Sequence, residues 1–314
     1  MNVVIDYLTM SSKIHSDRTF LQLLGVQDYD FIEVQGRYGW EKRHFYRGIS
    51  AYYGGRDDFC LELSGTGCRT VEEISGNRFN WFGFLSAFKE DLFGMDVNIS
   101  RLDIAADDRE GALNYRTMTR HCATDRYICK ARWRTWTDGD EQVIYFGSPA
   151  SDRRLRIYNK AMEQGLGEDD HWLRVEMQMR NKAAVSFYLN WIQAQGDIGG
   201  CYAGVLNDYI RFIKSPVQDN HYDRVSIAPW WRKFVGGVDK CKQLYLDGGH
   251  FDMWTVQHFL ERQAASSLKL WLQANHGDMS DIVDMIEGAK LNKRQQDLLD
   301  RILSEEVKSG IMIG

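Results

Sequence analysis

The sequence predicts an α+β protein in which an antiparallel sheet with flanking helices precedes a mostly helical C-terminal domain. Strand-like segments dominate the first 180 residues, and helix-like segments follow one another after residue 182. A length of 314 residues is enough for about two domains. The change in pattern falls near Lys214-Ser215-Pro216, so we expect an α+β domain over 1–214 and a helical domain over 215–314.

Runs rich in β-branched and aromatic residues mark the expected strands. Two of these runs are joined by Gly54-Gly55-Arg56-Asp57, which has the composition of a hairpin turn. The predicted strands cover 3–10, 48–54, 58–64, 99–106, 127–136, 142–147, 153–160 and 172–180. Apolar residues at helical spacing predict helices over 70–92, 111–121, 182–195, 201–214, 229–247, 252–275, 279–288 and 291–308.

The composition is typical of a soluble globular protein, with 44% hydrophobic and 26% charged residues. No apolar run reaches the length of about 18 residues that a membrane-spanning helix needs. The N-terminus has no basic stretch before an apolar run, which argues against a secretory signal. The six cysteines form no C-x-x-C pair, so they indicate neither a zinc site nor a disulfide framework, and we expect a cytoplasmic protein.

The net charge of −5 argues against a nucleic-acid-binding protein, because phosphate binding normally requires a basic surface. The charge is unevenly distributed, however. Between Arg116 and Lys160 there are ten Lys or Arg residues and five Asp or Glu residues. The composition is therefore compatible with one basic surface on an acidic body, and equally with an ordinary solvated face.

The strand expected at 153–160 divides its side chains between two faces, because residues two apart on a strand lie on the same side. Leu155 and Ile157 lie on one side. The other side carries a phenol among three cations, namely Arg154, Arg156, Tyr158 and Lys160. This pattern fits either a reactive tyrosine or a solvated strand face with an incidental tyrosine.

Neighbouring strands add carboxylates by the same alternation. Arg174 and Glu176 lie opposite an apolar set, and Asp103 and Glu62 lie opposite the apolar residues of their own strands. One face of the sheet is thus expected to collect Tyr158, several arginines and three acids. The acids either bind a metal ion or form ion pairs with the arginines, and the spacing favours neither interpretation.

This combination of residues suits attack on a phosphodiester. A tyrosine hydroxyl with a pKa of about 10 is a weak nucleophile at neutral pH, and neighbouring cations favour the phenolate. Arginines or a metal ion stabilise the charge that develops at the phosphate, and carboxylates are ligands that Mg²⁺ or Mn²⁺ prefers. A phosphotyrosine intermediate conserves the bond energy, so the strand can be rejoined without ATP.

The stretch from Arg126 to Trp136 interleaves aromatic and basic residues. Grooves that bind single-stranded nucleic acid have this composition, because bases stack on the rings while cations contact phosphates. A strand with a buried aromatic face is the alternative interpretation. The candidate DNA contacts are Lys130, Arg132, Arg134, Arg154 and Arg174.

Three motifs follow one another between about residues 95 and 190. They are Ser100-Arg101-Leu102-Asp103-Ile104-Ala105-Ala106-Asp107, Arg156-Ile157-Tyr158-Asn159-Lys160 and Trp172-Leu173-Arg174-Val175-Glu176. In order and rough spacing they resemble the motifs of the replication initiation factor family. This family includes rolling-circle replication initiators of small plasmids and relaxases of integrative conjugative elements.

The resemblance implies a nick in one DNA strand at an origin, at a single-stranded or hairpin site, with Tyr158 becoming linked to the 5′ phosphate. Arg156 and Lys160 belong to the same motif and are expected to assist catalysis. The resemblance also implies a divalent metal, Mg²⁺ or Mn²⁺, held by Asp103 and Glu176, while Glu62 matches only a looser pattern. It further implies a homodimer and a superfamily 1 helicase as partner, and a C-terminal domain for origin recognition or dimerisation.

Two alternatives remain open at this point. A relaxase that nicks the transfer origin of a conjugative element would use the same chemistry. A non-catalytic DNA-binding protein with a degenerate site would bind the origin without forming a covalent adduct.

Overall fold

The computed structural model describes residues 2–56, 58–93, 96–129, 131–138, 141–167, 170–217, 225–236, 256, 260, 264–292, 295–296, 298–300 and 302–303. The chain divides into two compact units, residues 1–246 and 247–314. The first unit contains a large antiparallel sheet with flanking helices, which confirms the predicted fold class.

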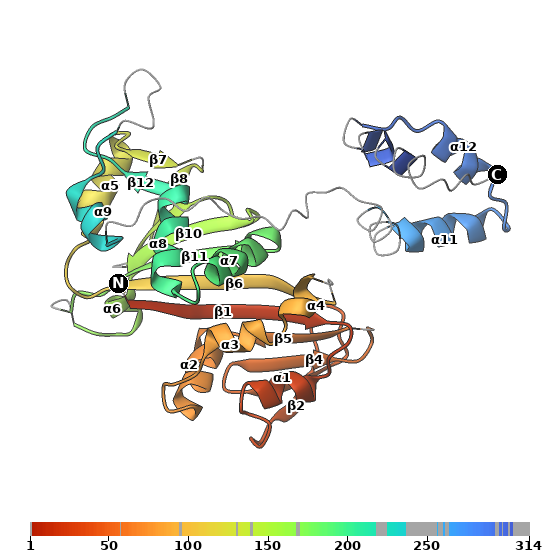
Figure 1. Ribbon diagram of the computed structural model, residues 1–314, viewed down its shortest axis with the longest axis horizontal. Coiled ribbons are helices and arrows are strands. Elements are labelled where there is room, and N and C mark those ends of the chain that lie inside the picture. The colour runs from red at the N-terminus through yellow and green to blue at the C-terminus, as the bar shows by residue number, and fades with distance from the viewer. Residues whose placement is uncertain are drawn as a thin grey trace. The chain divides into compact units, whose positions relative to one another are not determined.

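Ten strands of the first unit form one sheet in the order β2-β3-β4-β5-β1-β6-β11-β10-β9-β8 (Figure 1), and every neighbouring pair is antiparallel. The strands are β1 (Asn2–Ser12), β2 (Ile32–Gln35), β3 (Lys42–Tyr46), β4 (Ile49–Tyr53), β5 (Phe59–Leu63), β6 (Val97–Asp108), β8 (Trp133–Asp138), β9 (Glu141–Phe146), β10 (Arg153–Asn159) and β11 (Leu173–Arg180). The long strands β1 and β6 lie at its centre and connect the N-terminal strands with the strands that carry Tyr158 and Glu176.

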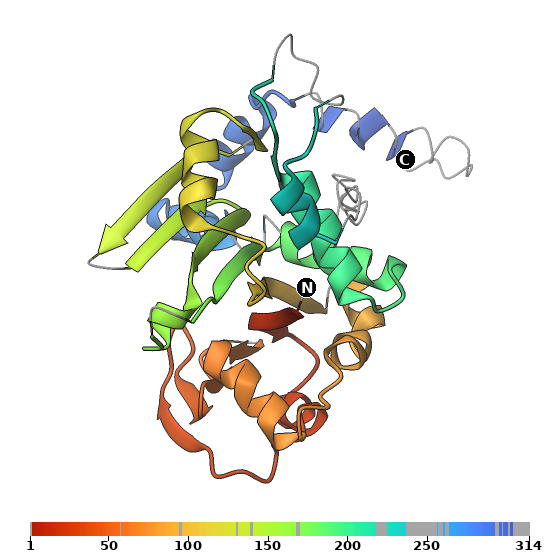
Figure 2. The ribbon, with the colours of Figure 1, turned by 90° about the vertical axis from the view of Figure 1, so that its left-hand side faces the viewer.

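The sheet has one apolar and one polar face, because its strands alternate apolar and polar residues. The apolar face forms the core, where Leu102, Ile157 and Val175 are fully buried. Helices α7 and α8 pack against the central strands (Figure 2). The helices associated with the sheet are α1 (Asp17–Leu23), α2 (Gly65–Ile74), α3 (Trp81–Ser86), α4 (Lys89–Phe93), α7 (Lys182–Gln193) and α8 (Ile198–Tyr209).

The opposite face of the sheet, which we call the polar face, carries the side chains of the predicted functional residues, among them Tyr158, Arg156 and Glu176. Cross-strand pairing sets them in rows. One row contains Trp136, Val143, Tyr158, Arg174 and Asp107. The next contains Arg134, Tyr145, Arg156, Glu176 and Ala105, and a third contains Arg154, Gln178, Asp103 and Tyr7.

The helix predicted over 70–92 is three shorter helices, α2, α3 and α4. Gly76 and Asn77 both adopt positive φ angles of 64° and 59°, so the chain leaves the helical path directly after α2. Asn80 then starts α3, because its side chain accepts a hydrogen bond from the backbone N–H of Gly83. A capping asparagine inside an apolar pattern was the overlooked signal.

The first compact unit continues beyond the boundary predicted at residue 214. The helix predicted over 201–214 ends at Tyr209, and β12 (Ile210–Phe212) pairs with β7 (Tyr127–Cys129) in a two-stranded sheet. Helix α9 (Pro229–Phe234) packs Trp231 onto Phe212, with ring centroids 5.1 Å apart, and the Trp231 indole donates a hydrogen bond to Asn207. These contacts attach residues after 214 to the α+β unit.

Three smaller differences concern segments that the sequence patterns divided wrongly or left unassigned. Residues 13–47 contain α1, β2 and β3, for which no element was predicted. The strand predicted over 127–136 is split into β7 and β8. The predicted helix over 111–121 is α5 (Tyr115–Ala123), and β10 is followed directly by the short helix α6 (Lys160–Glu163).

The second unit contains α11 (Ala265–Ala274) and α12 (Ser280–Glu287), which correspond to two of the predicted C-terminal helices. Much of the helices predicted over 229–247, 252–275 and 291–308 lies outside the described residues. Among the described helices, none combines the length and the apolar character needed to cross a membrane.

Candidate active site

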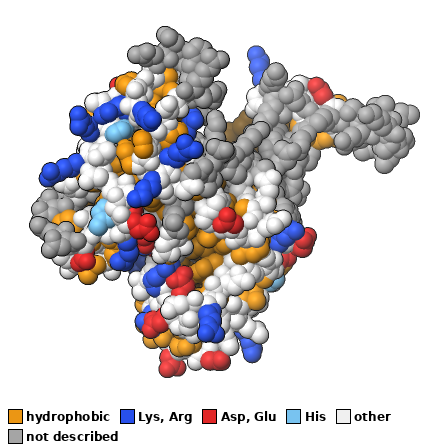
Figure 3. Space-filling model, turned by 60° about the vertical axis from the view of Figure 1, so that its left-hand side comes forward, with side chains coloured by type: hydrophobic (Ala, Val, Ile, Leu, Met, Phe, Trp, Pro, Cys, Tyr) orange, Lys and Arg blue, Asp and Glu red, His pale blue; other side chains and the backbone are white. Residues whose placement is uncertain are grey.

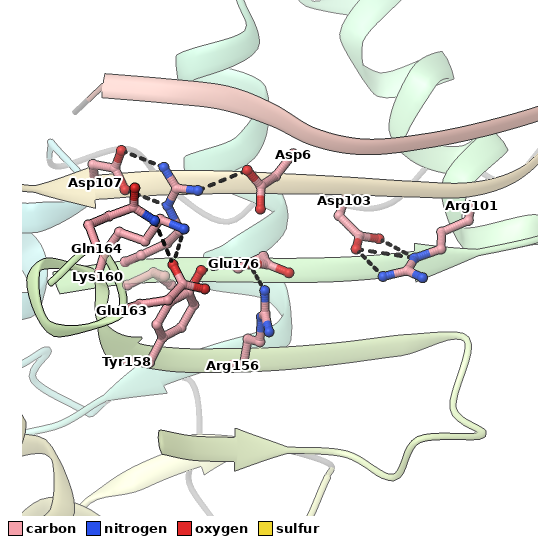
Figure 4. A network of polar contacts seen from close by, with 12 residues as sticks. Asp6, Arg101, Asp103, Asp107, Arg156, Tyr158, Lys160, Glu163, Gln164 and Glu176 are labelled. Carbon is pink, nitrogen blue, oxygen red and sulfur yellow. Dashed lines mark hydrogen bonds and ion pairs between the residues drawn. The ribbon is translucent and has the colours of Figure 1, made fainter. Parts of the chain in front are cut away.

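Tyr158 lies on the polar face with its hydroxyl directed at a carboxylate. The phenol donates a hydrogen bond to Oε2 of Glu176 over 3.2 Å, and Arg156 Nη2 donates to the same oxygen over 2.7 Å. The guanidinium of Arg156 also lies 4.7 Å from the centroid of the Tyr158 ring. Three side chains that the sequence placed on one face are thus in direct contact (Figure 4).

The electrostatics of Tyr158 run opposite to the expectation that neighbouring cations favour the phenolate. Burial of the phenol and the negative charge of Glu176 raise the pKa of Tyr158 well above 10, and Arg156 only partly offsets them. The side chain is 6% exposed. A nucleophilic Tyr158 therefore needs a base that removes its proton as the reaction proceeds.

Glu176 has the properties of such a base. Burial raises the pKa of its carboxyl to about 7, although Arg156 favours the ionised form, and the nearby negative charges of Asp6 and Asp103 add to the rise. A carboxyl with a pKa near the working pH is suited to accepting a proton. The side chain is 3% exposed, so its hydrogen bonds to Tyr158 and Arg156 are shielded from water.

Arg174, expected to contact DNA, is instead held by two carboxylates, Asp107 and Asp6, in a buried ion-pair cluster that we call the clamp. Its guanidinium donates to both carboxylate oxygens of Asp107, over 2.7 and 2.9 Å, and to Asp6 over 2.8 Å. The Arg174 side chain is 7% exposed. Because Arg174 is the cross-strand partner of Tyr158, the clamp fixes the strand beside the phenol rather than presenting a free cation.

Asp6 is a residue of the site that the sequence interpretation missed. In the pairing of β1 with β6, Ile5 lies opposite Ile104 and Tyr7 lies opposite the next residue, Asp103. Asp6 therefore has no partner in β6 and is the extra residue of a β-bulge. A bulge redirects a side chain locally, which here allows Asp6 to reach Arg174. The signal was present in the sequence, because the apolar residues Ile5 and Leu8 are three positions apart instead of two.

Lys160 does not lie on the strand face where the alternation placed it. The strand ends at Asn159, whose side-chain oxygen accepts hydrogen bonds from the backbone N–H groups of Ala161 and Met162 and so starts α6. Lys160 forms an ion pair with Glu163, and its ammonium lies 5.8 Å from the Tyr158 ring centroid. It therefore stays close to the phenol, but from a helix.

The three predicted metal ligands share the polar face but not a common centre. Asp103, 1% exposed, is bound by Arg101 over 2.6 Å, and Glu62 accepts a hydrogen bond from Tyr52 over 3.5 Å. Figure 4 shows the Asp103–Arg101 pair farther along the strands than Tyr158 and Glu176.

The donor chemistry of these oxygens suits a hard cation, but their arrangement does not fit a metal site. In the part of the chain that the structure describes, no group of three or more His, Cys, Asp or Glu side chains could hold a metal ion. Each predicted ligand is bound by a protein group instead. The arrangement therefore matches the ion-pair interpretation that the sequence left open.

The basic residues predicted to contact DNA lie around the outer strands of this face. The guanidinium of Arg154 stacks 4.2 Å from the centroid of Tyr145, and its buried Nε has no hydrogen-bond partner among the described residues. Arg132 and Arg134 are exposed, and Lys130 lies outside the described residues. Figure 3 shows Lys and Arg side chains gathered over the upper part of one side of the molecule and most acidic side chains lower down.

The sequence model of the replication initiation factor family matches residues 97–286, which include Tyr158, Glu176 and Arg156. The chain belongs to this family. The model of the N-terminal domain of rolling-circle replication initiation proteins matches residues 2–87, which include Asp6. The family predicted from the three motifs is thus confirmed.

A solved structure supports the same assignment. The fold is similar to that of a rolling-circle replication initiator protein from Geobacillus stearothermophilus, with a TM-score of 0.63 and 27% sequence identity. The similarity covers 77% of this chain and 99% of the other. Among curated proteins, none matches the chain.

Proposed function

We propose that this replication initiation factor nicks and rejoins one DNA strand at an origin through a covalent 5′-phosphotyrosine on Tyr158. The Tyr158 oxygen forms a bond to the scissile phosphorus, and the bond from phosphorus to the 3′ oxygen breaks. The 3′ oxygen leaves as a hydroxyl after taking a proton from water, while the proton of Tyr158 passes to Glu176. The reverse reaction, attack by a 3′ hydroxyl, rejoins the strand without ATP.

One observation carries this proposal: the hydrogen bond from the Tyr158 hydroxyl to Glu176. The phenol is a poor nucleophile while protonated, and Glu176 is the group positioned to take its proton during attack. By microscopic reversibility, the same carboxyl returns that proton when the phosphotyrosine bond is broken. Glu176, predicted as a metal ligand, thus acquires a role as general base.

Arg156 would stabilise the charge that develops on the phosphate. Its guanidinium lies against both the phenol ring and the Glu176 carboxylate, and its Nε has no hydrogen-bond partner among the described residues. A guanidinium in this position can donate to a phosphate oxygen next to the attacking atom. Lys160, close to the same ring, would add positive charge from α6.

A requirement for Mg²⁺ or Mn²⁺ is part of the proposal, with Asp103, Glu176 and Glu62 as the predicted ligands. When bound, such an ion would polarise the phosphate and screen its charge. Burial is the main cause of the raised pKa of Glu176, and the negative charges of Asp6 and Asp103, which add to it, would be screened by such an ion. Among the described residues these carboxylates do not converge on a common centre, so no step above depends on such an ion.

The proposed partner is origin DNA with a single-stranded or hairpin nick site. Arg132, Arg134 and Arg154 are the proposed phosphate contacts on the outer strands. A homodimer, a superfamily 1 helicase and origin recognition or dimerisation by the C-terminal helices remain predictions from the family. The similarity to a rolling-circle initiator favours replication over conjugative transfer as the role of the nick.

The test compares two tyrosines near one pocket. Supercoiled origin DNA is incubated with Tyr158→Phe or with Tyr145→Phe, whose tyrosine lines the same pocket. Tyr158→Phe is expected to give no nicked circles and no covalent adduct in a denaturing gel, while Tyr145→Phe retains both. Full nicking by Tyr158→Phe would refute the proposal, and binding without any adduct by the wild type would favour a non-catalytic DNA-binding protein.

A further inference from the structure

A shallow pocket of about 130 Å³ opens beside Tyr158 on the polar face. Its walls come from β8, β9, β10 and α6. The lining residues are Trp136, Gln142, Val143, Tyr145, Arg156, Tyr158, Asn159 and Glu163. The pocket thus includes the proposed nucleophile, but most of its wall consists of residues that the proposed chemistry does not use.

Trp136 is the most unusual residue of this wall, because a large aromatic side chain on a strand is left 46% exposed. It belongs to the same cross-strand row as Tyr158, with Val143 between them. An isolated exposed aromatic residue needs no explanation by itself. Here, however, the indole borders a pocket that also reaches the nucleophile, where a flat apolar surface is available to a substrate.

Tyr145 provides a second ring with a cation on it. It lies between Arg134 and Arg156 in the adjacent row, and the guanidinium of Arg154 is 4.2 Å from its ring centroid. Rings interleaved with arginines bind single-stranded DNA, because the bases stack and the phosphates pair with the cations. The pocket therefore lies within a surface that has both kinds of contact.

The polar part of the wall suits the edge of a nucleobase. Gln142 contributes a side-chain amide. The Asn159 oxygen is occupied by its cap on α6, which leaves the NH₂ group as a donor. Glu163, whose Oε2 pairs with Lys160, contributes a carboxylate to the wall. Donors and acceptors next to an aromatic surface are the features that hold an unstacked base.

We infer that this pocket binds one unpaired nucleobase of single-stranded DNA, adjacent to the phosphate attacked by Tyr158, with the base stacked on Trp136. The position of the scissile phosphate in this inference rests on the proposed function, whereas the binding of a base to the pocket does not. It assigns to the outer strands a role in recognising the melted strand, separate from the reaction.

The experiment measures binding without chemistry, in a Tyr158→Phe background. The two probes are a fluorescent oligothymidylate and an oligomer of the same length made only of abasic deoxyribose phosphate. Adding Trp136→Ala is expected to weaken oligothymidylate binding about tenfold, because the bound base loses the ring on which it stacks. Binding of the abasic oligomer should stay unchanged, and Trp136→Phe should retain most of the affinity.

The control is Tyr29→Ala, because Tyr29 is 40% exposed and lies between α1 and β2, in a segment for which no DNA contact is proposed. This variant should bind oligothymidylate as the parent does. Equal weakening of both probes by Trp136→Ala, or no weakening of either, would overturn the inference. Failure of the nicking assay in the wild type would refute the proposed function and leave this binding result standing.

Discussion

On the polar face, the pair Asp103–Arg101 and the pair Glu176–Arg156 each join a buried carboxylate to an arginine, and they differ in one decisive respect. Asp103 is bound by Arg101 through both oxygens, and the arginine stacks 3.8 Å from the Tyr7 ring centroid. Glu176 is bound by Arg156 through one oxygen, which also accepts the hydrogen bond from Tyr158. The Asp103 pair is internally satisfied, whereas the Glu176 pair also contacts the proposed nucleophile.

This difference shows why the residue types alone were ambiguous. Both pairs satisfy the same pattern of alternating strand residues, and both carboxylates have a pKa raised by burial. The distinguishing feature is the third partner and its access to a pocket, since Tyr158 and Arg156 line one beside them. A buried ion pair is weak evidence of function unless a reactive group shares it.

The largest expected contrast comes from neutralising each carboxylate in turn. Glu176→Gln removes the proton acceptor for Tyr158, and general-base catalysis is worth about 10²–10⁴-fold in rate. Asp103→Asn should leave the single-turnover nicking rate at saturating metal within a few-fold of wild type. Rapid-quench nicking assays would measure both rates, and equal losses in the two variants would abolish the distinction between the pairs.

The pH dependence of nicking sharpens the same comparison. Glu176 must be ionised to accept a proton, and its pKa is raised to about 7, so the single-turnover rate should fall as the pH drops below 7. Below that pKa the rate should fall about tenfold per pH unit. Asp103→Asn should keep the slope but move the profile to slightly lower pH, because it removes one of the negative charges that raise the pKa of Glu176. A rate independent of pH between 5.5 and 8 would contradict the role of Glu176 as base.

Metal titration tests whether Asp103 has a role beyond its ion pair. Chelation of divalent ions should stop nicking by the wild type, because the proposed reaction requires Mg²⁺ or Mn²⁺. Asp103→Asn should then raise the Mn²⁺ concentration for half-maximal nicking by about tenfold or more, as loss of metal-site support does elsewhere. If the Mn²⁺ concentration for half-maximal nicking did not change, Asp103 would not be a metal ligand and its ion pair with Arg101 would have only a structural role.

The smallest effect on rate is expected from the clamp on Arg174. Asp6→Asn weakens one charged hydrogen bond while Asp107 still holds the guanidinium, so we expect a loss of about 2 kcal/mol in unfolding free energy. Nicking should fall only a few-fold, because the strand beside Tyr158 keeps its other contacts. Urea denaturation would measure the change in unfolding free energy. A large loss of nicking without a loss of stability would instead indicate that Asp6 takes part in the reaction.

The sequence predicted the sheet and the shared face of Tyr158, Arg156 and Glu176, because strict alternation and three motifs determine both. It did not predict Asp6, which depends on a bulge, or the position of Lys160, which depends on the cap that ends β10. It also could not reveal that Glu176 contacts the phenol. Alternation assigns a side chain to a face, whereas partner choice depends on rotamers and on strand register.

The most direct test of the central claim is to identify the residue that becomes linked to DNA. The wild-type protein is allowed to nick a short origin oligonucleotide, the adduct is digested with protease and nuclease, and the modified peptide is sequenced by mass spectrometry. We expect a nucleotide on Tyr158, attached through its 5′ phosphate. A nucleotide on Tyr145 or any other residue, or a nicked product with no modified peptide, would contradict the account.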